Sequence, residues 1–482
     1  MEDHLGSALP RSLPADEHVD PAAVLATVEA IDADPAVELH SLMVLRHGRV
    51  VAEGWWAPHT PERTRLVYSL SKSFTSTALA FALEEGLVDL DDTVVSHFPE
   101  LDGDITDPGS RSITVRHVAS MASGHDREMI DEALALDPHE PVRGFLMVPP
   151  DAPPGTLFAY SQPCTYALAS IIQRAAGMPL SAYLRPRLLD PLGIGEVGWA
   201  TWPPGREQGF SGLFARTEDI AKLGLLYLRR GRWGQTQLIP EAYVEEATSR
   251  QVDNPDMENP DWRQGYGFQF WMARHGYRGD GAFGQFCIVL PEHDVVVATT
   301  GGTEAMQAVL DHLWTHLLPG LREDRPEDGA QPELERRLRG LSLAPHAARR
   351  QPGGQEGWTS PFAVAPGTGL TSVGVERAGD GLEVTLVEPD NALTFPVGTD
   401  GWLASSPLDA HGDVVPVAAS GGWDDDRTLR VEVAFLETPH RLRLTCSLPA
   451  RTAEAAWHTT PLDGGRLATL HCPRLRAPLP RG

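Results

Sequence analysis

The chain has 482 residues, of which 41% are hydrophobic and 22% charged, so it is long enough to fold around two or three cores. Its formal net charge of −26 repels phosphate backbones and anionic lipid headgroups, which argues against nucleic acid as a partner. Residues 1–20 carry acids and prolines in place of a secretory signal, and no later stretch reaches the roughly 20 apolar residues of a membrane span. We therefore expect a cytoplasmic protein that binds neither nucleic acid nor membrane.

The first predicted element is a β-hairpin at residues 42–53, where two runs rich in valine and leucine flank His47-Gly48-Arg49. Residues 69–85 have apolar side chains at helical spacing before Gly86, so we expect a helix that carries Ser69 at its N-terminus. Further helices are predicted at residues 165–174 and 217–229.

A second hairpin and a closing helix are predicted before residue 321. The runs 285–290 and 295–299 are apolar and strand-like, and a four-residue turn joins them. The helix that follows places six apolar side chains on one stripe and ends at Pro319-Gly320. Residues 21–321 therefore predict an α+β domain whose sheet joins both ends of the segment.

The composition changes after residue 321. Residues 322–360 are rich in charge, proline, glycine and alanine, and we interpret them as a linker. Residues 361–482 show short strand signals separated by turns, which predict a small antiparallel sandwich or barrel. Residues 1–20 are interpreted as an N-terminal extension. We expect the C-terminal domain to fold independently and to contribute no catalytic group.

Cysteine and lysine are both scarce. The four cysteines show no C-x-x-C pair and no zinc spacing, so we expect reduced packing residues. Only two of the 40 basic residues, Lys72 and Lys222, are lysines. Arginine serves most surface roles equally well, so a retained lysine indicates a function such as giving up its proton near neutral pH.

Ser69 and Lys72 give the first indication of chemistry, since they stand three residues apart on one helical face at a helix N-terminus. A serine hydroxyl is a weak nucleophile until a base takes its proton. The positive end of the helix dipole favours a neutral amine and an alkoxide-like serine there. The pattern alone is weak, because an exposed lysine at a helix start gives the same spacing.

Two more motifs lie further along the chain. Tyr160 stands just before a predicted helix, where it could share the proton of Ser69 and Lys72 or simply pack as a loop aromatic. Residues 279–284 match the dinucleotide pattern G-x-G-x-x-G, but a strand follows them where a phosphate loop needs a helix. We therefore reject a nucleotide site and expect glycines that allow close approach of backbone or ligand.

Other catalytic and ligand patterns are weaker. The chain has no H-E-x-x-H pair, and His117, His125 and His275 fit helix starts or the surface better than a metal site. No G-x-S-x-G elbow is present, which excludes an α/β-hydrolase. Six tryptophans either line an acyl pocket or pack in the core: Trp55, Trp56, Trp199, Trp202, Trp262 and Trp271.

Together these motifs resemble the serine β-lactamase-related hydrolases, a family of class C β-lactamase and esterase type that shares the penicillin-binding-protein fold. The resemblance covers roughly residues 20–320. It rests on landmarks in family order, which are residues 68–75, 86–92, 113–118, 123–124, 154–160, 191–194, 212–213 and 284–292. It implies an antiparallel sheet flanked by helices. The C-terminal domain resembles the lipocalin-like appendages of some members.

The resemblance also implies catalytic roles. Ser69 is the expected nucleophile, Lys72 its general base, and Tyr160 the group that shuttles the proton to the leaving group. The backbone amides of Ser69 and Ala282 are the expected oxyanion hole.

Four further residues are expected to contact substrate: Gln162, Gly279, Asp280 and Gly281. Gln162 departs from the family's Tyr-x-Asn motif. Gly279 stands where Lys-Thr-Gly or His-x-Gly has the group that meets a substrate carboxylate. Asp280 would add negative charge to the pocket, and Arg278 should point to the opposite face from Gly279 because side chains alternate along a strand.

We therefore expect a serine hydrolase that cleaves a small ester or amide through an acyl-enzyme on Ser69, with no cofactor and no metal. β-Lactams, which carry a carboxylate, should be poor substrates. Acyl transfer to an amine or alcohol is the first alternative, and a catalytically silent binding protein is the second. The sequence patterns do not indicate an oligomeric state.

Overall fold

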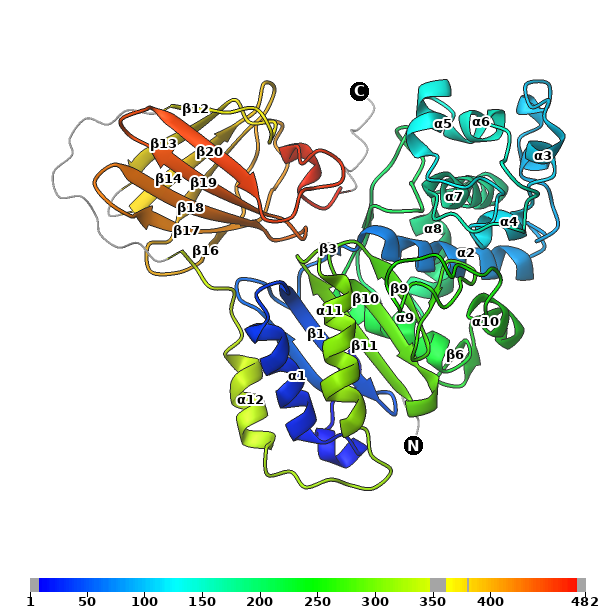
Figure 1. Ribbon diagram of the computed structural model, residues 1–482, viewed down its shortest axis with the longest axis horizontal. Helices are drawn as coiled ribbons and strands as arrows, with labels where there is room; N and C mark the ends of the chain where they lie inside the picture. The colour runs from blue at the N-terminus through cyan, green and yellow to red at the C-terminus, as the bar shows by residue number, and fades with distance from the viewer. Residues whose placement is uncertain (1–7, 347–360, 379–380, 475–482) are drawn as a thin grey trace, which may run out of the picture.

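The computed structural model describes residues 8–346, 361–378 and 381–474. Figure 1 shows two domains, which we call the N-terminal domain (residues 8–346) and the C-terminal domain (residues 361–474). Each domain has a hydrophobic core of its own.

The N-terminal domain contains an antiparallel sheet in the order β2-β1-β11-β10-β9-β8. β1 and β11 pair along their length, so the two ends of the domain meet inside one sheet. Its strands are β1 Leu39–Arg46, β2 Arg49–Trp55, β8 Trp271–Met272, β9 Tyr277–Gly281, β10 Gln285–Leu290 and β11 Val295–Gly301. A small sheet beside it is formed by β3 Arg65–Leu66, β4 Gly198–Trp199 and β5 Leu213–Ala215.

Helices cover both faces of the larger sheet, which is why every residue of β1, β10 and β11 is buried. The helices are α1 Pro21–Ala33, α2 Ser71–Glu84, α3 Pro108–Arg111, α4 Val115–Ala119, α5 Ile130–Leu136, α6 Pro141–Met147, α7 Gln162–Ala176, α8 Leu180–Leu184, α9 Thr217–Leu228, α10 Glu241–Ala247, α11 Met306–His312 and α12 Gln331–Arg339. α1, α11 and α12 lie on one side of the sheet and α9 on the other (Figure 1).

Both hairpins and the helices predicted at residues 165–174 and 217–229 are confirmed by β1–β2, β10–β11, α7 and α9. The helix predicted to begin at Ser69 begins at Ser71 instead. Residues Tyr68–Leu70 form a separate 3-10 turn, because Tyr68 has a φ of 48° that an α-helix cannot accommodate.

The C-terminal domain is a nine-stranded sheet in the order β15-β14-β13-β12-β20-β19-β18-β17-β16. Gly398, just after β15, pairs with Ser420 in β17, so the sheet nearly closes on itself around an apolar interior. This confirms the predicted β domain, which is antiparallel except where β12 pairs with β20 in parallel. Its strands are β12 Phe362–Val364, β13 Ser372–Ala378, β14 Gly381–Val387, β15 Ala392–Val397, β16 Leu403–Ser405, β17 Val417–Trp423, β18 Thr428–Phe435, β19 Arg441–Ser447 and β20 Thr452–Trp457.

Part of the segment predicted as a linker belongs to the N-terminal domain. α12 packs on β2, and Leu334 and Leu341 are buried in the N-terminal core. The remainder of that prediction, residues 347–360, lies outside the described residues. None of the helices in the described ranges combines the length and the apolar character that a membrane span requires.

Candidate active site

Ser69 lies in a tight turn between β3 and α2. Tyr68 has a φ of 48°, in the left-handed region that residues other than glycine rarely adopt. Ser71 Oγ donates to Tyr68 O at 2.6 Å and so fixes the turn. Ser69 is thereby held just ahead of the N-terminus of α2, on the wall of a cavity.

Lys72 reaches back from the first turn of α2 to Ser69. Its Nζ lies 3.0 Å from Ser69 Oγ and donates to Gln162 Oε1 at 2.6 Å and to Phe210 O at 2.9 Å. A neutral amine has two hydrogens and one lone pair. Because Gln162 and Phe210 take the two hydrogens, the lone pair of a neutral Lys72 faces Ser69, as a general base requires.

The environment of Lys72 favours its neutral form. The side chain is 1% exposed, and burial lowers its pKa to about 7, although the carboxylates of Glu128 and Asp280 act in the opposite direction. A large fraction of the amine is therefore unprotonated near neutral pH. Arginine would remain charged in the same place, which gives a physical reason for a lysine here.

Tyr160 lies over Lys72, with its ring centroid 4.7 Å from Nζ, and it lines the same cavity as Ser69. The ring stacks on Trp271 at a centroid distance of 5.1 Å. Burial and the nearby Asp280 carboxylate raise the pKa of Tyr160 well above its ordinary value, so the phenol is protonated at neutral pH. It can therefore donate a proton beside the nucleophile.

The glycines of β9 let the strand pack closely against the tight turn that carries Ser69. We call this turn, residues 67–70, the nucleophile turn. A Cβ on Gly281 would lie 2.0 Å from Val67 O, and one on Gly279 would lie 2.4 Å from a side chain of α2. Both glycines thus serve close backbone approach, and Ala282 reaches the cavity wall that Ser69 also lines. The side-chain position of Gly279 faces α2, and contact of its backbone with substrate stays a prediction.

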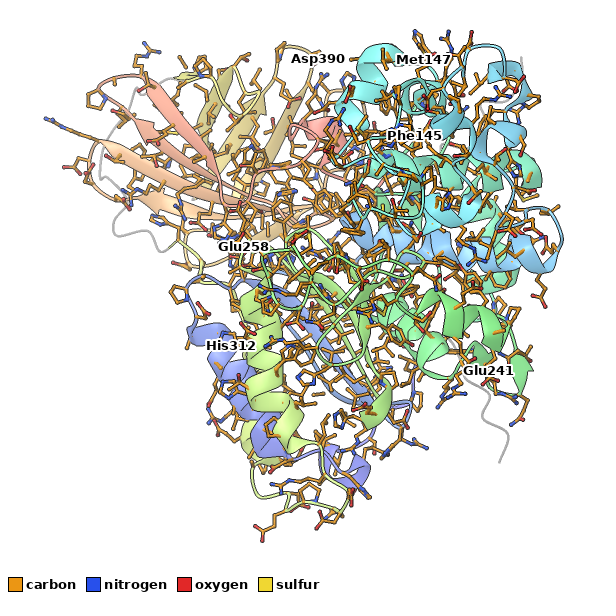
Figure 2. All side chains as sticks on the ribbon, turned by 45° about the vertical axis from the view of Figure 1, so that its right-hand side comes forward. Phe145, Met147, Glu241, Glu258, His312 and Asp390 are labelled. Carbon is orange, nitrogen blue, oxygen red and sulfur yellow. The ribbon has the colours of Figure 1, made fainter. Side chains whose placement is uncertain are left out.

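The cavity beside Ser69 has a volume of about 550 Å³, a size suited to a small molecule. Figure 2 labels Glu258 in the loop that contributes Met257 and Asn259 to it. The lining residues are Ser69, Tyr160, Gln162, Met257, Asn259, Trp262, Trp271, Asp280, Ala282, Glu304, Ala305, Met306, Gln307 and Leu462. The cavity therefore joins an aromatic and apolar wall to a few amide and carboxylate groups.

Only part of the tryptophan set lies at this cavity. Trp262 and Trp271 line it, in agreement with the acyl-pocket interpretation. Trp56 instead donates to Asp32 Oδ1, and Trp199 donates to Ser211 O. These two therefore fit the alternative, ordinary packing.

Arg278 and Asp280 form a buried ion pair on the cavity side of β9. Arg278 Nη2 lies 3.0 Å from Asp280 Oδ2, Nη1 donates to Asp261 O, and the guanidinium lies 4.2 Å from the Trp262 ring. Arg278 does face away from Gly279, as strand alternation predicts. Asp280 lines the cavity, and the charge of Arg278 two residues earlier compensates its carboxylate.

The C-terminal domain reaches the site through Leu462, His440 and Glu437. Leu462 lines the cavity, and His440 Nε2 lies 2.6 Å from the hydroxyl of Tyr68, the residue before the nucleophile. Glu437 O accepts the backbone N–H of Leu66 at 2.9 Å. The domain thus forms part of the cavity wall and supports the nucleophile turn, which the sequence did not predict.

Two further groups at the site were not predicted. Phe210 contributes through its backbone carbonyl, which no sequence motif marks. Glu128 accepts the backbone N–H of Gln162 at 3.0 Å and so fixes the residue that holds Lys72. Among the histidines, His117 caps the start of α4 as expected, whereas His125 is buried between Ser123 Oγ and Val148 O and not at the surface.

Comparisons with known proteins show the family of the chain. A family model described as "Beta-lactamase" matches residues 26–309. The 6-aminohexanoate-dimer hydrolase of Paenarthrobacter ureafaciens is 25% identical over 293 residues, which cover 53% of this chain and 71% of that protein. Esterase EstB of Burkholderia gladioli is 24% identical over 216 residues, which cover 39% of this chain and 55% of that protein.

Among solved structures, the crystal structure of SurE matches with a TM-score of 0.50 and 20% identity, covering 92% of this chain and 99% of SurE. At this identity the likeness shows the fold alone. Because it extends over nearly the whole chain, it includes both domains. The predicted penicillin-binding-protein-like fold is confirmed.

Proposed function

Because the chain belongs to the beta-lactamase family, we propose that it is a serine hydrolase that cleaves a small ester or amide through an acyl-enzyme on Ser69. The observation that carries this proposal is the contact between Ser69 Oγ and a buried lysine amine of lowered pKa, 3.0 Å apart. A receptor without catalytic function has no need of a deprotonatable lysine at that position.

In the first step Ser69 Oγ attacks the carbonyl carbon of the substrate while Lys72 Nζ takes the serine proton. The carbonyl oxygen becomes an oxyanion, which the backbone amides of Ser69 and Ala282 would stabilise. Tyr160 then donates a proton to the leaving oxygen or nitrogen as its bond to the carbonyl carbon breaks, and Lys72 restores the phenol proton. An ester between the acyl group and Ser69 remains.

In the second step water attacks the acyl ester and gives its proton to the same lysine and tyrosine pair. Cleavage of the ester bond returns the proton to Ser69 Oγ and releases the acid. Trp262, Trp271 and Met306 supply an apolar wall in the cavity, which favours an apolar acyl group. The named activities of the two curated relatives support esters and amides as the substrate class.

Labelling with a fluorophosphonate, followed by intact-mass analysis and peptide mapping, tests the proposal. We expect one adduct on Ser69 in the wild type and none in Ser69→Ala. Lys72→Arg leaves a side chain that stays protonated and cannot act as a base, so this variant should react at least about 100-fold more slowly. A native protein that takes no adduct, or takes it on another residue, would favour the binding-protein alternative.

A further inference from the structure

The C-terminal domain holds a second cluster of ligand-type side chains, away from Ser69. Asp409 and Asp413 lie between β16 and β17, and His471 lies in the segment after β20. One carboxylate oxygen of each aspartate and one imidazole nitrogen all lie within 4.8 Å of one another. Figure 1 shows the segment after β20 on the side of the domain that faces the rest of the molecule.

His471 gives an independent sign that a ligand belongs here. The side chain is 9% exposed, and its Nε2 is buried without a hydrogen-bond partner. Nδ1 lies 3.1 Å from the carbonyl oxygen of Cys472, which can only accept a hydrogen bond, so Nδ1 carries the proton. Nε2 is then left with an unshared electron pair, and the imidazole stands beside two carboxylates, an arrangement that a cation would satisfy.

The groups around the cluster hold it in place. Asn391, next to the Asp390 labelled in Figure 2, donates to Asp409 Oδ2 at 2.9 Å. Asp409 Oδ1 accepts the backbone N–H groups of His411 and Asp413, each at 2.9 Å. Metal-binding histidines and carboxylates in proteins are oriented by second contacts of this kind, often a backbone carbonyl on the far imidazole nitrogen.

We propose that Asp409, Asp413 and His471 bind one divalent metal ion. The combination of one imidazole nitrogen and two carboxylate oxygens suits Zn²⁺, with Mn²⁺ as the next choice, better than the all-oxygen preference of Mg²⁺ or Ca²⁺. Asp413 is half-buried, so water has access to complete the coordination.

The ion would fasten the last segment of the chain to the loop before β17. Directly after His471, the backbone N–H of Cys472 donates to Glu437 Oε2 at 2.8 Å, and Glu437 O accepts from Leu66 beside the nucleophile turn. The bound metal would therefore stabilise the edge of the C-terminal domain that meets the active site. It takes no part in the proposed hydrolysis.

Calorimetric titration of the chelator-treated full-length chain with Zn²⁺ and with Mn²⁺, near neutral pH, tests the site. We expect one equivalent of Zn²⁺, with binding weakened at least about 100-fold in both His471→Ala and Asp413→Asn. His139→Ala, which removes an exposed histidine elsewhere, is the matched control and should bind like the wild type. Equal binding by all variants, or no binding by the wild type at about 100 µM metal, would overturn the proposal.

Thermal unfolding separates loss of the site from loss of the fold. Zn²⁺ at about 100 times its Kd should raise the melting temperature of the wild type by roughly 5–10 °C, because it binds the native state. Without metal, both variants should melt cooperatively near the metal-free wild type and show no shift on addition of Zn²⁺. The same shift in Asp413→Asn as in the wild type would contradict the assignment.

Discussion

Replacement of Lys72 by methionine should abolish activity and stabilise the fold, and the stabilisation should depend on pH. In the folded protein the pKa of Lys72 is lowered from 10.5 to about 7. Between these pH values the unfolded chain holds a proton that the folded protein lacks, so native stability rises with pH across this window. Below this pH window the native protein holds the amine in its charged form, and burial of that charge lowers the free energy of unfolding by its full amount. Methionine fills a similar volume and does not titrate.

The expected magnitude follows from the two pKa values. A pKa lowered by about 3.5 corresponds to roughly 5 kcal/mol, at about 1.4 kcal/mol for each pH unit. By linkage, the lowered pKa of Lys72 reduces the free energy of unfolding of the wild type by roughly 5 kcal/mol at pH 6 and by roughly 2 kcal/mol at pH 9. The advantage of Lys72→Met in unfolding free energy should therefore fall by about 3 kcal/mol over this range. The hydrogen bonds lost at Gln162 and Phe210 weaken the variant at both pH values, so the difference between pH values isolates the titration.

Urea unfolding followed by tryptophan fluorescence measures the stabilities, and fluorophosphonate labelling measures reactivity at Ser69. Labelling of the wild type should rise with pH through about 7, as neutral Lys72 forms. Lys222→Met, which removes the other lysine, should label like the wild type. A stability difference that stays constant from pH 6 to pH 9 would refute the low pKa of Lys72. Undiminished labelling of Lys72→Met would exclude it as the base.

Four other outcomes are expected. Tyr160→Phe should slow amide hydrolysis about 100-fold and hydrolysis of p-nitrophenyl esters much less, because p-nitrophenolate leaves without a proton. Equal losses of kcat for amides and esters would contradict the role of Tyr160 as the proton shuttle. Gly281→Ala should lower both the melting temperature and the rate of labelling at Ser69, because its Cβ would lie 2.0 Å from Val67 O. Unchanged values would show that the nucleophile turn can move to accommodate the added methyl group. The kcat/KM for p-nitrophenyl butyrate should exceed that for nitrocefin at least about 100-fold, because Arg278 is buried and already paired and so does not bind the carboxylate of nitrocefin. Similar values for the two substrates would reveal an unassigned group that binds this carboxylate. Leu462→Ala should change KM for bulky acyl esters more than kcat, and a pure kcat effect would place it elsewhere in the mechanism.

Local patterns predicted the parts of the site that lie close together in the sequence. Ser69 and Lys72 are three residues apart, and the short 3-10 turn that runs into α2 leaves Lys72 Nζ 3.0 Å from Ser69 Oγ. The alternation of side chains along a strand correctly separated Arg278 from Gly279. The same rule places Asp280 on the face of Arg278, two residues away, so their pairing was accessible from the sequence.

The remaining parts of the site depend on long-range packing. Phe210 acts through a carbonyl that every residue possesses, so its position only appears once the chain is folded. Leu462 and Ser69 are far apart in the sequence, and docking of one domain on another follows from surface complementarity that no periodicity encodes. The beginning of α2 also differed from the prediction, because the turn at Tyr68 interrupts a pattern that is helical in its apolar spacing.

The contact between the domains indicates that they act as a unit. Arg65, two residues from the nucleophile turn, is 3% exposed and donates to Leu436 O and to Thr438 O of the C-terminal domain. Burial lowers its pKa to about 9, and the carboxylates of Glu38 and of Glu437 in the C-terminal domain act in the opposite direction. Loss of the C-terminal domain would remove both carbonyls, at a cost of about 1–3 kcal/mol for each donor left without a partner if it stays buried. The strand that leads to Ser69 would then have to rearrange toward solvent. A chain ended near residue 321 would also lack α12, so the structure favours retention of both domains for full reactivity.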